Sequence, residues 1–145
     1  MDFSIRSAQA GDVGELAVLS GQLGYPVDEE EMRRRLARVR AERLGEVLVA
    51  GANESKRILG WTHVVPRLQL EEEPFAELAG LIVVDEARGS GVGAALLTAA
   101  EHWARGAGFG LMRVRSNIVR ERAHRFYERA GYCRVKQQAV FHKSI

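Results

Sequence analysis

The feature that most constrains the fold is a long apolar run that leads directly into a glycine-rich turn. Phe75–Val84 carries almost no charge, as expected of a central strand that is buried on both faces. Arg88 and the glycine-rich Gly89–Ala94 follow, and apolar side chains then recur at helical spacing as far as Arg105. Such a chain must cover both faces of a sheet and begin a helix near the end of its central strand.

The rest of the pattern predicts a mixed α/β fold. No repeat, linker or low-complexity tract divides the chain, so residues 1–145 are expected to form one domain. Gly80 lies inside the central strand and favours a bulge there, or the close approach of another group to the backbone. The expected elements are strand Phe3–Ser7, helices that begin near Asp12 and Asp28, strands Val47–Ala50, Ile58–Val65 and Phe75–Val84, helix Ser90–Arg105, strand Leu111–Arg115, a helix over Ala123–Ala130 and an extended last segment, Tyr132–His142.

Composition limits the class of protein. With 145 residues, 46% hydrophobic and 28% charged, the chain suits a folded domain rather than a disordered one. Its uncharged stretches are shorter than the roughly 20 apolar residues of a membrane span, and its N-terminus does not resemble an export signal. Cys133 is the single cysteine and is expected to be buried, and the histidines lack metal-ligand spacing. We therefore expect a cytoplasmic protein with no membrane partner and no metal site.

Charge is distributed unevenly along the chain. Residues 105–145 contain ten basic and two acidic side chains, a net charge of +8, whereas residues 1–104 contain eleven basic and seventeen acidic ones, a net charge of −6. The basic part could hold a polyanion such as a phosphorylated cofactor, and the acidic part could attract a cation. Few aromatic residues lie between the arginines, so nucleic acid is not expected as a partner.

The glycine-rich turn is where an anion would bind, because glycines let backbone N–H groups converge on phosphate oxygens at a helix N-terminus. Tight strand-to-helix turns also use glycine for purely structural reasons. Gly89, Gly91 and Ala94 formally match the dinucleotide-binding pattern, but no acidic residue follows about 20 positions later, and a Walker loop is excluded by its missing Gly-Lys-Ser/Thr. The other interpretation is Arg-x-x-Gly-x-Gly, formed by Arg88, Gly91 and Gly93.

With that pattern the chain resembles the GNAT superfamily of N-acetyltransferases over nearly everything from Ile5 onward. Ile5-Arg6-x-Ala8 with Asp12 is similar to the family's opening strand and helix, and Ala123-His124-x-Phe126-Tyr127-Glu128-x-x-Gly131-Tyr132 is similar to its late helix and strand. The resemblance implies a largely antiparallel central sheet flanked by about four helices, with acetyl-coenzyme A as co-substrate. It also implies that the backbone of Leu81, Ile82 and Val83 pairs with the pantetheine arm, and that the pyrophosphate is held by Arg88, Gly89, Ser90, Gly91, Val92, Gly93 and Ala94.

Two further residues are candidates for catalysis. By the resemblance, Tyr127 stands where the family has its tyrosine acid, which would assist departure of the coenzyme A thiolate. Phe75-Ala76-Glu77-Leu78 resembles the strand that carries the catalytic glutamate of the histone-acetylating branch, so Glu77 is a candidate base. The structural alternatives are a tyrosine that fills the core, and a glutamate that lies at an exposed strand start or pairs with an arginine. Either Asn117 or Arg120 is expected to contact the cofactor.

The expected function is transfer of acetyl from acetyl-coenzyme A to a primary amine by direct attack. The acceptor is predicted to be a small cationic amine, similar to an aminoglycoside or a polyamine, or an amine of a peptide or protein. Acidic residues at Asp28–Glu31 and Glu71–Glu73 are expected to recruit it. A non-catalytic acyl-coenzyme A sensor is the alternative function, and a dinucleotide-binding module is a more distant one. An unpaired C-terminal edge predicts a homodimer in which these segments meet or exchange.

Overall fold

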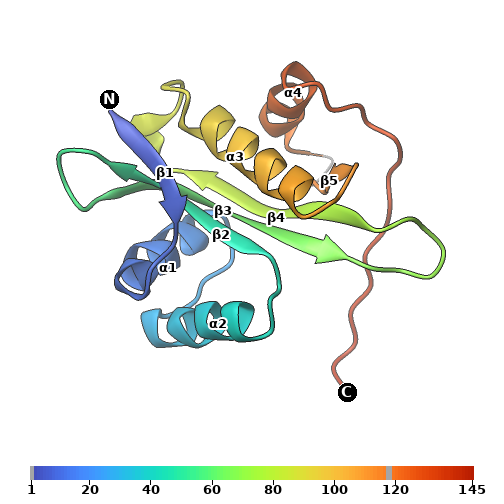
Figure 1. The fold of residues 1–145 in the computed structure, drawn as a ribbon, viewed down its shortest axis with the longest axis horizontal. Helices are drawn as coiled ribbons and strands as arrows, with labels where there is room; N and C mark the ends of the chain where they lie inside the picture. The colour runs from blue at the N-terminus through green and yellow to red at the C-terminus, as the bar shows by residue number, and fades with distance from the viewer. Residues whose placement is uncertain (1, 117–118) are drawn as a thin grey trace. The chain divides into compact units, whose positions relative to one another are not determined.

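The computed structural model describes residues 2–116 and 119–145, which belong to two compact units, residues 1–114 and residues 115–145. The first unit contains a five-stranded sheet in the order β1-β2-β3-β4-β5 (Figure 1). Neighbouring strands from β1 to β4 pair antiparallel, and β5 pairs parallel to β4. The strands are β1 Phe3–Ser7, β2 Glu46–Ala52, β3 Ile58–Arg67, β4 Phe75–Val83 and β5 Met112–Val114. The predicted mixed, largely antiparallel sheet is confirmed.

Helices cover both faces of this sheet, with α3 on one face and α1 and α2 on the other (Figure 1). Their ranges are α1 Val13–Gln22, α2 Glu29–Ala41 and α3 Val92–Gly106, with 3-10 turns η1 at Ala10–Asp12 and η2 at Asp85–Ala87. The apolar stripe of each helix packs inward, since Leu16, Leu36 and Leu96 are all buried. The helices predicted from apolar spacing in residues 1–114 are therefore confirmed, although α3 begins at Val92 rather than at Ser90.

Asp12 and Asp28, the two aspartates near which helices were expected to begin, behave differently. The Asp28 carboxylate accepts a hydrogen bond from the backbone N–H of Glu31 at 2.7 Å, so Asp28 is the N-cap of α2. Asp12 makes no such bond to α1, because the 3-10 turn precedes that helix. Its carboxylate instead accepts the backbone N–H of Gln9 at 2.7 Å and pairs with Arg6 at 2.8 Å. Asp12 therefore ties β1 to the turn.

The second unit, residues 115–145, contains α4 at Glu121–Arg129. Around Tyr127 the rings of Phe126 and Tyr132 pack edge to face, at centroid distances of 5.1 and 5.9 Å. Residues 132–145, which the structure describes throughout, are assigned to no strand, so the expected strand character of Tyr132–His142 is wrong for the single chain. Alternation alone does not make a strand, because the backbone must also form ladder hydrogen bonds with a neighbour. Cys133 is exposed, which corrects its predicted burial.

The structure bears on two features considered from the composition, membrane-spanning helices and metal-binding groups. None of the helices within residues 2–116 and 119–145 is both long and apolar enough to cross a membrane. In the same part of the chain, His, Cys, Asp and Glu side chains form no group of three or more that could hold a metal ion.

His63 on β3 fastens the connection between α2 and β2. Its Nε2–H donates to the backbone carbonyl oxygen of Leu44 at 2.9 Å. Burial lowers the pKa of His63, and this effect exceeds the opposing influence of the Leu44 hydrogen bond and of nearby Glu46. His63 therefore has a structural role, with the Leu44 carbonyl as its partner.

The lowered pKa of His63 predicts a stability that depends on pH. Because the folded-state pKa lies below the unfolded value of about 6.5, the unfolded chain takes up the proton first as the pH falls. Acidification from about pH 7.5 to about 5.5 should therefore reduce the free energy of unfolding more in the natural protein than in His63→Gln, whose amide can still donate to Leu44. Urea titrations at both pH values measure the difference, and equal losses in the two proteins would contradict it.

Candidate functional site

The sheet opens between β4 and β5. Ala76–Leu78 pairs with Met112–Val114, and among the described residues that pairing stops there. Beyond it β4 continues, and Gly80–Val83 pairs with β3 on the other side. Backbone N–H and C=O groups of this segment that point away from β3 therefore line an open strand edge, and such an edge can accept an extended ligand as an additional strand. Leu81, Ile82 and Val83, the residues predicted to pair with a pantetheine arm, belong to this segment.

A β-bulge lies where the open edge begins. Val64 is opposite Leu78 and His63 is opposite Gly80, so Ala79 is the extra residue of β4. The bulge inferred from Gly80 is thus confirmed. It also changes which side chains share a face, because Glu77, opposite Val65, lies on the same face as Ile82, opposite Trp61. Simple alternation along the sequence predicts that Glu77 shares a face with Leu81, and this prediction is wrong because the extra residue reverses the order of faces.

The glycine-rich turn adopts the backbone shape that its sequence predicts. Gly89 and Gly91 have φ values of 80° and 90°, in the left-handed region that residues with a Cβ rarely enter. The Ser90 hydroxyl donates to the carbonyl oxygen of Ala87, and Gly91 is the N-cap of α3. The first N–H groups of a helix have no acceptor within the helix, so this turn offers donors and the positive end of the helix dipole. These are the properties of an anion site.

Arg88 lies at the entrance of this turn with its side chain half exposed. Its Nη2 is 3.2 Å from Oδ1 of Asp85, which is more exposed still. An exposed ion pair of this kind contributes little free energy and exchanges easily. The guanidinium can therefore leave Asp85 for a phosphate, with which it would form stronger charge-assisted bonds.

Glu77 is buried and paired with an arginine. Its residue is 6% exposed, and Nε and Nη2 of Arg67 lie 3.2 and 3.1 Å from Oε2. Of the two structural explanations for this glutamate, an exposed strand start is contradicted by its burial, whereas pairing with an arginine is observed. Burial of a carboxylate is costly without such a partner.

A second ion pair lies beside the first. Arg113 of β5 is opposite Glu77 in the β4–β5 register, but its guanidinium is 3.1 Å from Glu72 and 3.9 Å from the ring centroid of Phe75. Sequence reasoning identified neither Arg67 nor Arg113. No sequence pattern indicates them, because the strand register decides which side chain a single arginine near a strand end contacts.

Tyr127 belongs to the second unit, so the structure assigns it no distance to Glu77 or to Arg88. Burial raises the pKa of Tyr127, against a smaller opposite influence of Arg120. The side chain is therefore a protonated phenol at neutral pH. Arg120 is the N-cap residue of α4, and Asn117 lies outside the described residues.

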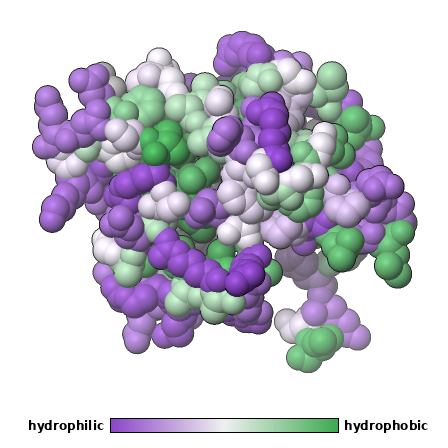
Figure 2. Space-filling view, in the orientation of Figure 1, coloured by the Kyte–Doolittle hydropathy of each residue, from purple (hydrophilic) through white to green (hydrophobic). Residues whose placement is uncertain are grey.

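The acidic residues expected to recruit a cation differ in how far they are neutralised. On α2, Glu29, Glu30 and Glu31 pair with arginines one turn further along, at distances between 3.2 and 3.7 Å. Figure 2 shows hydrophilic side chains gathered over this helix. The arginines offset most of the negative charge of Asp28–Glu31, so this cluster retains little charge with which to attract a cationic acceptor.

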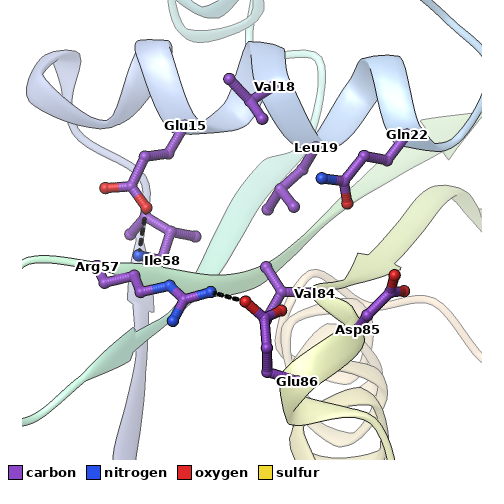
Figure 3. Close-up of a pocket in the computed structure, with 9 residues that line it drawn as sticks. All are labelled: Glu15, Val18, Leu19, Gln22, Arg57, Ile58, Val84, Asp85 and Glu86. Carbon is purple, nitrogen blue, oxygen red and sulfur yellow. Dashed lines mark hydrogen bonds and ion pairs between the residues drawn. The ribbon is translucent and has the colours of Figure 1, made fainter.

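A cavity of about 410 Å³ opens between α1 and the far end of β4 (Figure 3). Across it, Arg57 lies 2.6 Å from Glu86, and Glu15 accepts the backbone N–H of Ile58 at 2.6 Å. Its lining comes from α1, from the start of β3 and from the turn after β4: Glu15, Val18, Leu19, Gln22, Arg57, Ile58, Val84, Asp85 and Glu86. Asp85 thus belongs to this wall and to the ion pair with Arg88.

The model of the Acetyltransferase (GNAT) family matches residues 15–132, and the chain belongs to this family. It is 35% identical over 102 residues to the aminoglycoside N(6')-acetyltransferase type 1 of Klebsiella aerogenes, which is 68% of this chain and 66% of that protein. It is 46% identical over 58 residues to the aminoalkylphosphonate N-acetyltransferase of Salmonella typhimurium, which is 40% of this chain and 38% of that protein. The matched parts therefore span less than two thirds of either relative.

Solved structures share the whole fold. The aminoglycoside N-acetyltransferase AAC(6')-Iy in complex with CoA has a TM-score of 0.87 at 16% identity, covering 99% of this chain and 96% of that one. A transcriptional regulator from Bacillus halodurans C-125 has a TM-score of 0.84 at 24% identity, covering 98% and 100%. The predicted GNAT-like sheet with flanking helices is confirmed by these similarities.

The backbone of the glycine-rich turn can be tested without any ligand. Gly91→Ala should reduce the free energy of unfolding by about 1–2 kcal/mol, because a Cβ disfavours the left-handed region. A Cβ on Gly91 would meet nothing within 4 Å, so the loss would report the backbone conformation rather than a clash. Gly11→Ala is the matched control, since a Cβ there also meets nothing and its φ is not left-handed. Equal urea midpoints for the two variants would contradict this interpretation.

Proposed function

We propose that this protein is an N-acetyltransferase that moves acetyl from acetyl-coenzyme A to a primary amine by direct attack, and that residues 1–145 act as a single domain. The observation that carries the proposal is the continuity of β4, which leads from an open strand edge straight into the glycine-rich turn. One strand-turn-helix segment can thus hold both an extended amide-containing arm and its phosphates. Family membership and the CoA complex of AAC(6')-Iy support the same choice of co-substrate.

The residues of this segment fit coenzyme A. Leu81, Ile82 and Val83 would pair with the pantetheine arm through their backbone groups. The pyrophosphate would lie against Gly89–Ala94, where no Cβ on Gly89 or Gly91 obstructs the N–H donors, and Arg88 would add a forked cation. Arg120 or Asn117 would supply a further contact to the cofactor.

The proposed transfer balances as follows. The acceptor nitrogen forms a bond with the acetyl carbon, the carbon–sulfur bond breaks, and coenzyme A leaves as a thiolate. Glu77, directly or through water, takes one proton from the substrate ammonium, because an alkylammonium with a pKa near about 10 cannot attack while protonated. The nitrogen releases a second proton to solvent as the amide forms, and Tyr127 regains from solvent the proton that it donates. N–H groups near the bulge at Ala79 polarise the acetyl oxygen, and Tyr127, kept neutral by its raised pKa, protonates the thiolate.

The proposed acceptor is a small cationic amine, aminoglycoside-like or polyamine-like, or an amine of a peptide or protein. The names of the two relatives support a small amine, since one acts on aminoglycosides and the other on aminoalkylphosphonates. We further propose that the protein acts in the cytoplasm as a homodimer. The exposed thiol of Cys133 suits a reducing compartment. Exposed apolar side chains in the C-terminal segment, Val135, Val140, Phe141 and Ile145, suit contact with a second copy.

Arg88→Ala should weaken coenzyme A binding by about 1.5–3 kcal/mol, the usual loss for a charge-assisted bond. Calorimetric titration of both proteins with coenzyme A measures the change. Arg57→Ala is the matched control, because Arg57 also pairs with a carboxylate of η2 but lies on the α1 side, in the wall of the cavity. Equal affinities of Arg88→Ala and the natural protein would reject the phosphate role of Arg88, and no binding at all would reject the proposed co-substrate.

Glu77→Gln and Tyr127→Phe should each lower kcat by about 10²–10⁴-fold, the usual contribution of a positioned acid or base, and leave acetyl-coenzyme A affinity nearly unchanged. Thiol release over a panel of amines measures turnover, and the same assay separates an enzyme from a sensor. A protein that binds coenzyme A but releases no thiol with any amine would favour the acyl-coenzyme A sensor. If Glu77→Gln kept its full kcat, a group other than Glu77 would have to take the proton from the acceptor amine.

A further inference from the structure

The ion pair between Arg67 and Glu77 joins one buried partner to one exposed partner. The Glu77 side chain is 8% exposed, whereas the Arg67 side chain is 43% exposed. Arg67 is the last residue of β3 and lies opposite Phe75, so its side chain reaches diagonally along the sheet face to the carboxylate two residues further along β4. The guanidinium therefore lies on the solvent side of Glu77.

The neighbouring arginine is held more firmly. Arg113 has a side chain that is 21% exposed, bound to Glu72 and stacked over Phe75. Both hydrogen-bonding and cation–π contacts must be lost before it can move. Arg67 has no cation–π contact among those that the structure describes, and its charge is at the surface. Of the two arginines whose ion pairs the structure describes at this part of β4, Arg67 has fewer contacts to lose when another cation takes its place.

Charge balance then sets a condition on any cationic ligand. In the two ion pairs that the structure describes here, Arg67 offsets Glu77 and Arg113 offsets Glu72, so an ammonium brought to Glu77 would add a further cation to carboxylates that already have one each. Repulsion between unit charges a few ångströms apart is strong where water is partly excluded. An arriving ammonium can bind Glu77 at low cost only by replacing the guanidinium.

We propose that Arg67 is an exchangeable counter-ion of Glu77, which closes an ammonium site on the β4 face in the free protein and is displaced when a cationic amine binds. This inference rests on the proposed function for its ligand, the acceptor amine, and it makes Arg67 a specificity-determining residue. Arg67 selects for cationic ligands whose contacts with Glu77 and its surroundings together outweigh the exposed Arg67 ion pair. A neutral ligand gains nothing from the exchange.

The test needs neither acetyl-coenzyme A nor turnover. In Arg67→Ala, ethylammonium or methylguanidinium chloride should raise Tm by about 2–4 °C more than it does in the natural protein, because the buried carboxylate has lost its ion pair with Arg67. Sodium chloride at equal ionic strength is the salt control. Arg67→Lys keeps a cation and should respond like the natural protein. Arg57→Ala, directly before the opposite end of β3 and also in an exposed ion pair, should show no additional response.

The double variant Arg67→Ala/Glu77→Gln identifies the partner of the added cation. It has no carboxylate at this position, so the additional rise in Tm should disappear. If Arg67→Ala does not fold, hydrogen exchange of the Arg67 Nε–H in the natural protein should become at least about threefold faster with ethylammonium, as expected of a displaced guanidinium. Equal responses of all variants, an additional rise that persists in the double variant, or unchanged exchange would overturn the proposal.

Kinetics separate this inference from the proposed function. In Arg67→Ala the KM for a diamine acceptor should fall by about threefold or more, while the KM for acetyl-coenzyme A stays constant, because only the competition at Glu77 is removed. Thiol release without selective cation binding would reject the exchange of Arg67 but would still support the proposed acetyltransferase function. Selective cation binding without thiol release for any amine would support the ammonium site at Glu77 and reject the proposed acetyltransferase function.

Discussion

The bulge at Ala79 determines how the rest of the site is arranged. One extra residue in β4 bends the strand at the point where β5 stops pairing with it, so hydrogen-bonding groups that would otherwise be satisfied become an open edge. Exposed strand edges are normally a liability, and proteins keep them only where something covers them. A substrate arm that pairs as a strand is one such cover. The same extra residue places Glu77 and Ile82 on one face of the sheet.

The glycine-rich turn depends on this strand for its position. β4 is hydrogen-bonded to β3 along its length and buried at Phe75, Ala76 and Leu78, so the turn that follows it has a rigid support. α3 then carries the turn's donors on the end of a helix whose Val92, Leu96 and Ala100 are fully buried. An anion site held in this way is formed before the ligand arrives, so binding loses little free energy to ordering.

At the other end of β4, the burial of each charged side chain decides how much its ion pair matters, and the number of charges does not. A carboxylate as buried as that of Glu77 requires a counter-ion, and removal of one partner of such a pair usually costs much more than the pair contributes. A half-exposed arginine fulfils this need without filling the site permanently. On α2, by contrast, the ion pairs are exposed, and their contribution is small.

Sequence alone determined the elements of the first unit, because helix and strand periods are local properties of the chain. It also located the glycine-rich turn, since only glycine enters the left-handed backbone region easily, as Gly89 and Gly91 do. Only the tertiary structure decided which residues surround Glu77. Arg67 and Arg113 are ten and thirty-six positions away from it, and strand register and a single bulge bring them to it. The last segment, residues 132–145, shows the same limit, because a strand requires a neighbour that its own sequence does not specify.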